Sequence, residues 1–175
     1  MKKLLLASMC MTTLALAACD KKPNENTTAV AEKNDTPAMT TLSNNVMADI
    51  KTDLAQLEML SNTKAQEALS FQTEVTQAAQ SGDQKALEGV VDKMEKYMDT
   101  FNDDLDALKL KSTEASNLRE KMKQSNELGV ELAEAGIEKT PNMEKINELQ
   151  KKGVELQESI LKDMQDLQSK VNMAA

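Results

Sequence analysis

Apolar side chains recur every three or four residues through most of this chain, from Val46 to Val171. This spacing gathers them on one face of an α-helix, whereas a half-buried strand would show strict alternation. The whole chain contains 5 glycines and 3 prolines, so few positions can interrupt such helices. The pattern therefore predicts an all-α protein, an elongated antiparallel helical bundle built from coiled-coil-like hairpins of three long helices.

The first helix is expected to begin where the apolar period begins. Ser43 or Asn44 can cap its N-terminus, because a side-chain oxygen there accepts hydrogen bonds from the free N–H groups of the first turn. The expected helical domain covers residues 43–175, with helices at about 44–80, 83–135 and 141–172.

The first turn is predicted at Ser81-Gly82-Asp83-Gln84. Gly82 can adopt the left-handed conformation that ends a helix. Ser81 together with Gln84 matches a capping box for the next helix, and Asp83 is a rival N-cap. So short a turn predicts two antiparallel neighbours.

The second turn is predicted between Gly136 and Pro141. Gly136 is the expected C-terminal cap, with Ile137 making the accompanying apolar contact. Thr140 is the expected N-cap of the last helix, and Pro141 suits its first position.

The middle helix would be about 80 Å long if it is unbroken. Its seam alternates four and three residues, although Ser112 and Arg119 are polar residues on that seam. Neither glycine nor proline marks the segment Lys111-Ser112-Thr113, so we favour one long helix. A break near Ser112 would instead give a four-helix bundle.

The two turns also predict which residues meet across the antiparallel pairs. In this register the rod is three helices thick near residues 105–122. The expected contacts are Leu57 with Leu105 and Leu108, Phe71 with Val91 and Met94, Leu128 with Leu149, and Ala115 with Ile160 and Leu161.

The chain begins with the parts of a secretory signal peptide. Met1-Lys2-Lys3 is positively charged, and the apolar stretch Leu4–Ala18 is shorter than the roughly 20 residues that span a bilayer. The stretch ends in Leu16-Ala17-Ala18-Cys19, which resembles the lipobox of bacterial lipoproteins. The resemblance implies removal of residues 1–18, S-diacylglycerol on Cys19, and an N-acyl chain such as palmitate on its new terminus. Several acyl chains together anchor a protein stably.

Asp20 follows the expected lipidation site. An aspartate there resembles the signal that retains enterobacterial lipoproteins at the inner membrane, whereas the neighbouring Lys21 weakens that resemblance. The inner and the outer membrane therefore both stay open. Residues 19–42 are rich in Thr, Asn, Lys and Pro and show no apolar period, which predicts a flexible tether.

The charge of the chain excludes some partners. Residues 1–18 contain Lys2, Lys3 and no acid, so 19 of the 21 basic residues remain against 29 acidic ones, a formal net charge of −10. Such a balance argues against nucleic acid and against electrostatic binding to anionic lipid headgroups. We expect membrane attachment through the lipid on Cys19.

No catalytic or metal-binding constellation is expected. The chain contains no histidine, which excludes a histidine-based triad, a histidine-ligated haem and most zinc sites. Met94 and Met98 could serve as soft copper(I) ligands, but they lie on the apolar seam and are better explained as packing residues. The acidic segment 102–106 lacks the glycine and distant glutamate of a calcium loop, which favours a solvated helix face. The same interpretation covers two further pairs of acids, Glu131 with Glu134 and Glu155 with Glu158.

These features predict an envelope lipoprotein that acts through protein–protein contacts or as a structural helical rod. We expect the domain to face the periplasm, with a protein partner or a second copy of itself, and without cofactor, metal or catalysis. One alternative is a ligand- or metal-binding bundle in the periplasm. Another is a lipoprotein that excludes phages or plasmids.

Overall fold

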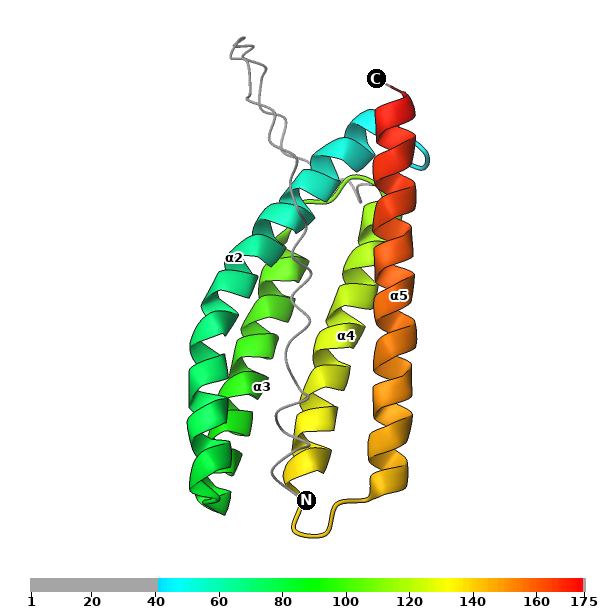
Figure 1. Cartoon of the computed structure of the whole chain (residues 1–175). Helices are drawn as coiled ribbons and strands as arrows, with labels where there is room; N and C mark the ends of the chain where they lie inside the picture. Colours follow the sequence, from blue (N-terminus) through cyan, green and yellow to red (C-terminus); the bar gives the residue numbers. More distant parts are fainter. Residues whose placement is uncertain (1–40, 175) are drawn as a thin grey trace.

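The computed structural model describes residues 41–174, and this part of the chain is all-α. An isolated bridge between Ser43 and Ser112 joins the segment before the first helix to the middle of the chain. Figure 1 shows the helices as an elongated bundle. The described helices are α2 (Met47–Ser81), α3 (Gln84–Ala107), α4 (Thr113–Ile137) and α5 (Met143–Met173).

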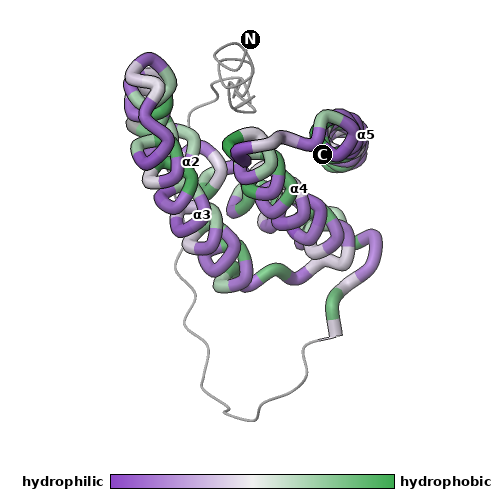
Figure 2. Tube along the Cα trace, turned by 90° about the horizontal axis from the view of Figure 1, so that it is seen from below, coloured by the Kyte–Doolittle hydropathy of each residue, from purple (hydrophilic) through white to green (hydrophobic). Residues whose placement is uncertain are grey.

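Two antiparallel hairpins, α2–α3 and α4–α5, form the bundle (Figure 1). We call the end with the start of α2, the α3–α4 connection and the C-terminus of α5 the closed end, because all four helices contribute to its core. The opposite end, with the α2–α3 turn and the α4–α5 loop, is the open end. There α2 and α5 lie on opposite sides of the molecule, as both views show (Figures 1 and 2). Much of α2 is therefore covered on one side only.

The main hydrophobic core lies at the closed end. Its side chains are aliphatic, as the scarcity of aromatic residues requires, and each is at most 6% exposed. A smaller cluster of Ala135, Ile146 and Leu149 joins α4 to α5 toward the open end. The main core consists of Ile50, Leu54, Leu57, Leu105, Ala115, Leu118, Ile160, Met164 and Leu167.

The predicted register is confirmed where these clusters report on it. Leu57 and Leu105 share the main core with Ala115 and Ile160, and Leu108 packs against it. The expected contact of Ala115 with Leu161 is wrong, because Leu161 is 38% exposed on the outer side of α5. Leu128 packs against the small cluster that contains Leu149.

The single long helix expected over 83–135 is wrong, and the alternative of a break near Ser112 is confirmed. The helix α3 ends at Ala107, Leu108 has extended backbone angles, and α4 begins at Thr113 with Ser112 as its N-cap. The chain reverses at this connection without glycine or proline, because side-chain hydrogen bonds from elsewhere hold it. The expected rod of three helices is replaced by two hairpins side by side, with α2 about 50 Å long.

At the first turn the structure selects between the two predicted caps. Gly82 has φ 67°, as predicted for a left-handed C-terminal residue. Asp83 is the N-cap of α3 and accepts a hydrogen bond from the N–H of Lys85. The alternative capping box is wrong, because Ser81 still belongs to α2.

Three other helix ends differ from their predictions. The helix α2 starts after Val46 without a side-chain cap, because Ser43 bonds to the α3–α4 connection instead. The helix α4 continues through Gly136 to Ile137. The helix α5 is capped by Asn142, whose side chain accepts from the N–H groups of Glu144 and Lys145. Thr140 is therefore not the cap, and Pro141 precedes the helix instead of occupying its first position.

Candidate functional site

The predicted lipidation and sorting residues, Cys19 and Asp20, lie outside the described residues, as does most of the expected tether. The structure does show where this part of the chain joins the bundle. The N–H of Ser43 donates to the carbonyl of Lys111 (2.7 Å), and the N–H of Thr113 donates to the carbonyl of Ser43 (2.9 Å). The N-terminal segment is thus fixed to the closed end.

A buried carboxylate organises this closed end. Asp53 on α2 is fully buried. Its Oδ2 accepts hydrogen bonds from the N–H groups of Lys111 (2.8 Å) and Ser112 (2.7 Å) and from the Ser112 hydroxyl (2.7 Å). Because α4 begins directly after Ser112, the acid also lies where the helix dipole favours negative charge. Asp53 therefore stabilises the reversal that separates α3 from α4.

A second polar cluster joins α2 to α3. Lys64 is 7% exposed and forms ion pairs with Asp104 (2.8 Å) and Glu67 (3.2 Å), and its pKa is raised, mainly through the hydrogen bond with Asp104. The hydroxyl of Tyr97 donates to the carbonyl of Lys64, and the Tyr97 ring lies 5.1 Å from that of Phe71. Burial raises the pKa of Tyr97 to about 12. These ion pairs, the hydrogen bond and the ring contact lie within and between α2 and α3, and they join the two helices.

Ion pairs also join α4 to α3 in the first hairpin and to α5 in its own hairpin. Lys123 on α4 bonds both carboxylate oxygens of Asp106 on α3 (2.7 and 2.9 Å), which lowers the pKa of Asp106 and raises that of Lys123. Lys121 pairs with Asp163 on α5 (2.6 Å). Asp106 and Asp163 are only partly covered, so each of these pairs contributes little to stability.

The acidic segment 102–106 lies within α3, as its interpretation as a helix face required. Its carboxylates point to different neighbours: Asp104 to Lys64, and Asp106 to Lys123. Within residues 41–174, no three acidic, histidine or cysteine side chains converge to hold a metal ion. Met94 and Met98 are half-buried on α3.

An open cavity of about 310 Å³ lies between the start of α3 and the end of α4. Gln84 and Ile137 both line it, and the side chain of Gln84 donates to the carbonyl of Ile137 (2.7 Å). Acids dominate the polar part of the lining. The lining consists of Gln84, Glu88, Val91, Asp92, Glu134, Ile137, Glu138 and Lys139.

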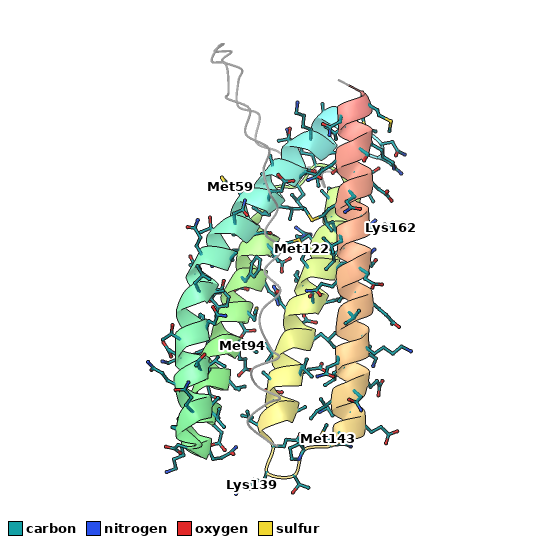
Figure 3. The ribbon with its side chains drawn as sticks, in the orientation of Figure 1. Met59, Met94, Met122, Lys139, Met143 and Lys162 are labelled. Atoms are coloured by element: carbon teal, nitrogen blue, oxygen red, sulfur yellow. The ribbon has the colours of Figure 1, made fainter. Side chains whose placement is uncertain are left out.

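The outward side of α2 has an unusual surface, which we call the outer stripe. Its members are all exposed, and none is charged. Met59 and Leu69 are 69% and 61% exposed. Figure 3 shows Met59 pointing away from the bundle, whereas Met122 lies between the helices and packs on the main core. The stripe consists of Ala48, Thr52, Ala55, Met59, Asn62, Gln66, Leu69, Thr73, Thr76 and Gln80.

The charged residues in the second half of α2 lie away from this stripe. Lys64, Glu67 and Glu74 all take part in ion pairs on the side of α2 that faces α3. The outward face of α5, by contrast, carries exposed charges of both signs, including Glu155 and Lys162. Water-facing helix surfaces are normally charged in this way. Among the described helices, α2 thus presents an outward face suited to contact with another surface.

Comparison with protein families decides the identity of the chain. A family model described as "Uncharacterised lipoprotein PM1805" matches residues 51–172, which include nearly all of the helical bundle. The chain belongs to this lipoprotein family. No curated protein and no solved structure matched the chain.

Family membership agrees with the resemblance of Leu16-Ala17-Ala18-Cys19 to a lipobox, and these residues lie outside the matched region. In the described part of this lipoprotein, no helix has both the length and the apolar character needed to cross a membrane.

Sequence reasoning missed two features of the lipoprotein. Asp53 stands between the apolar positions of the first helix, and nothing near it in the sequence marks it as a buried acceptor. Its role follows only from the hydrogen bonds with Lys111 and Ser112 at the α3–α4 connection. The outer stripe is inconspicuous in the sequence because a more hydrophobic stripe runs along the same helix. Its signal was present in the sequence as a second series of uncharged residues, spaced alternately three and four apart.

Proposed function

We propose that this lipoprotein is anchored to a membrane of the bacterial cell envelope by acyl chains on Cys19, and that its bundle acts by binding protein. Membership of a lipoprotein family and the sequence Leu16-Ala17-Ala18-Cys19 support the anchor. The surface of α2 supports the mode of action. The proposal includes removal of residues 1–18 and a periplasmic location of the bundle.

The closed end is the end nearer to the membrane in this proposal. The described chain enters the bundle there, through Ser43 and its bonds to Lys111 and Thr113. A flexible segment of about twenty residues has a mean span of roughly 25 Å. The helix α2 extends about twice that distance from the closed end, so the outer stripe would stand clear of the lipid headgroups.

The outer stripe is the observation that carries the proposed mode of action. The centres of protein interfaces are depleted in charged residues and enriched in methionine and aromatic side chains. Met59 and Leu69 supply exposed apolar area without a charge between them along the stripe. Keeping this stripe uncharged in an acidic protein indicates that it meets another protein.

Palmitate labelling of cells that produce the protein tests the anchor. We expect label in the membrane-bound wild-type chain and none in Cys19→Ala, which should also retain residues 1–18. Ala17→Ser, which keeps a small residue before the cysteine, serves as the matched control. Label in Cys19→Ala, or an unlabelled wild type, would remove the lipid anchor from the proposal.

Asp20→Ser tests the sorting residue in the same cells. If Asp20 retains the protein at the inner membrane, this change should shift the protein toward the outer-membrane fraction of a density gradient. An unchanged distribution would show that Asp20 does not determine the location.

Photo-crosslinking in intact cells tests binding through the stripe. A photoreactive residue at Leu69 should give discrete adducts, to any protein including a second copy, whereas the same residue at Glu155 on α5 should give few. Equal adducts from both positions would contradict binding through the stripe.

A further inference from the structure

The outer stripe has the repeat of a coiled-coil seam. Its members follow one another at alternating steps of four and three residues from Ala48 to Gln80. This spacing keeps a single line of side chains along the helix, the geometry by which two helices pack knobs into holes. The buried side of α2, with Ile50, Leu54 and Leu57, is a separate line that already packs inside the bundle. The helix α2 therefore carries two seams, and one of them has no partner in the described chain.

We propose that the outer stripe pairs in parallel with the outer stripe of a second copy of this chain, around a two-fold axis. The inference rests on the proposed function, because the anchor holds both copies on one membrane. Attachment at the closed ends aligns those ends, and a two-fold axis then brings each residue of the stripe opposite the same residue of the other copy.

Charge favours a second copy at this surface. The mature chain has a formal net charge of −10, so most of its surface repels another copy. Along the second half of α2 the positions beside the stripe are also uncharged; Thr63, Gln72 and Gln77 are exposed examples. Like charges would not oppose each other when this half of α2 meets its counterpart. The exposed faces of α3, α4 and α5 are charged, so two copies that met through one of them would bring like charges together.

The size of the stripe determines how strong the pairing is. A stripe of about 50 Å along a helix about 10 Å wide covers roughly 500 Å² per copy. Stable interfaces usually bury about 800 Å² per partner, so the pair should be weak in free solution. Polar Asn62 and Gln66 at seam positions favour one register at a cost in stability. Attachment to a shared membrane raises the effective concentration and compensates for the small area.

Cysteine crosslinking of the full chain in its membrane tests the proposal. Residues 41–174 contain no cysteine, so Leu69→Cys introduces one thiol into the bundle. Mild oxidation should yield a disulfide-linked dimer at least ten times more abundant than with Glu155→Cys, an exposed control on α5. Equal dimer from the two positions would overturn the pairing.

A second set of variants tests the pairing through the outer stripe without changing the fold. Asn62→Cys should crosslink to itself, and adding Met59→Lys should reduce that dimer at least fivefold, because two lysines would then face each other. Adding Met59→Leu should leave it unchanged. Both substitutions are at an exposed residue, so circular dichroism should be the same for all three variants. Equal crosslinking with Met59→Lys would contradict the proposed seam.

The crosslinked products also separate this inference from the proposed function. An adduct of Leu69→Cys with a protein of different mass would leave binding through the stripe intact and overturn the second copy as its partner. Absence of any adduct in membranes where Cys19 is lipidated, from Leu69→Cys and from the photoreactive residue at Leu69 alike, would overturn both. A dimer of the lipidated chain that stays as abundant after the membranes are dissolved in excess detergent, at the same total protein concentration, would overturn the role of the membrane in the pairing.

Discussion

The carboxylate oxygen Oδ2 of Asp53 lies 2.7 Å from the hydroxyl of Ser112, although 59 positions separate the two residues in the chain. The same oxygen accepts the backbone N–H groups of Lys111 and Ser112. One side chain on the first hairpin thus satisfies three donors at the start of the second. This contact explains how the chain reverses between α3 and α4 without glycine or proline.

Removing this carboxylate should destabilise the bundle strongly. Asp53→Ala leaves two buried donors of Ser112 and the part-buried N–H of Lys111 without their acceptor, and we expect the free energy of unfolding to fall by about 3 kcal/mol. Asp53→Asn keeps an oxygen for Ser112 and should cost less, about 1–2 kcal/mol. Urea denaturation followed by circular dichroism measures both.

Asp99→Ala provides the control for that series. Asp99 is exposed on α3, so its replacement should change the free energy of unfolding by no more than about 0.5 kcal/mol. If Asp53→Ala were as mild as Asp99→Ala, the hydrogen bonds at the α3–α4 connection would not hold it.

The direct coupling between Asp53 and Ser112 can be isolated by a double-mutant cycle. Ser112→Ala removes the hydroxyl and the N-cap of α4, at a cost of about 1–2 kcal/mol. The double variant with Asp53→Ala should be more stable than the sum of the single losses predicts, by about 1–2 kcal/mol, because the residues share one contact. Additive losses would refute the coupling, and additivity is expected for the control pair of Asp53→Ala with Thr100→Ala.

The α2–α3 turn was predictable because its causes are local. Gly82 ends α2 in a left-handed conformation and Asp83 caps α3, and both roles follow from residues that are adjacent in the chain. Only the choice between two neighbouring caps needed the structure. Local patterns likewise predicted the helical class and the register of the core.

The α3–α4 break was not predictable in the same way. Ser112 keeps the heptad spacing although it is polar, and helix propensity does not exclude it there, so the sequence offered the break only as an alternative. The hydrogen bonds that favour the break come from α2, so they exist only once the hairpins have met. The later start of α5 at Met143 has a local cause: the side chain of Asn142 replaces that of Thr140 as the cap.

The outer stripe could be predicted from the sequence only in part. The uncharged spacing from Ala48 to Gln80 is present in the sequence, but whether such a line is buried or exposed depends on which side of α2 packs inward. The lipidation site, by contrast, is inferred from a sequence motif alone, and Cys19 remains a prediction.

Tyr97, the single tyrosine of the chain, should lose its proton at a higher pH than an exposed tyrosine does. Burial, with a smaller contribution from Glu67, raises the pKa of Tyr97 to about 12, whereas an exposed tyrosine ionises near 10. The unfolded chain therefore releases this proton first, and the free energy of unfolding should fall as pH rises from about 10 through about 12. Ultraviolet absorbance of phenolate measures the midpoint directly.

Tyr97→Phe is the matched variant for this pH dependence. It keeps the ring beside Phe71 and removes the hydroxyl that donates to the carbonyl of Lys64. The alkaline loss of stability should become shallower, and the remainder should reflect Lys64, whose pKa is also raised. A midpoint near 10 in the folded wild type would contradict the buried position of the hydroxyl.

Two glycines should respond to alanine with opposite signs. Gly82 has φ 67°, where a β-carbon costs about 1 kcal/mol, so Gly82→Ala should lower the free energy of unfolding by that amount. Gly89 lies within α3 and a β-carbon there would meet nothing within 4 Å, so Gly89→Ala should raise it by about 0.5–1 kcal/mol. Neither β-carbon would contact other atoms, so both differences arise from the backbone alone. Equal effects in urea denaturation would mean that the turn at Gly82 does not require the left-handed conformation.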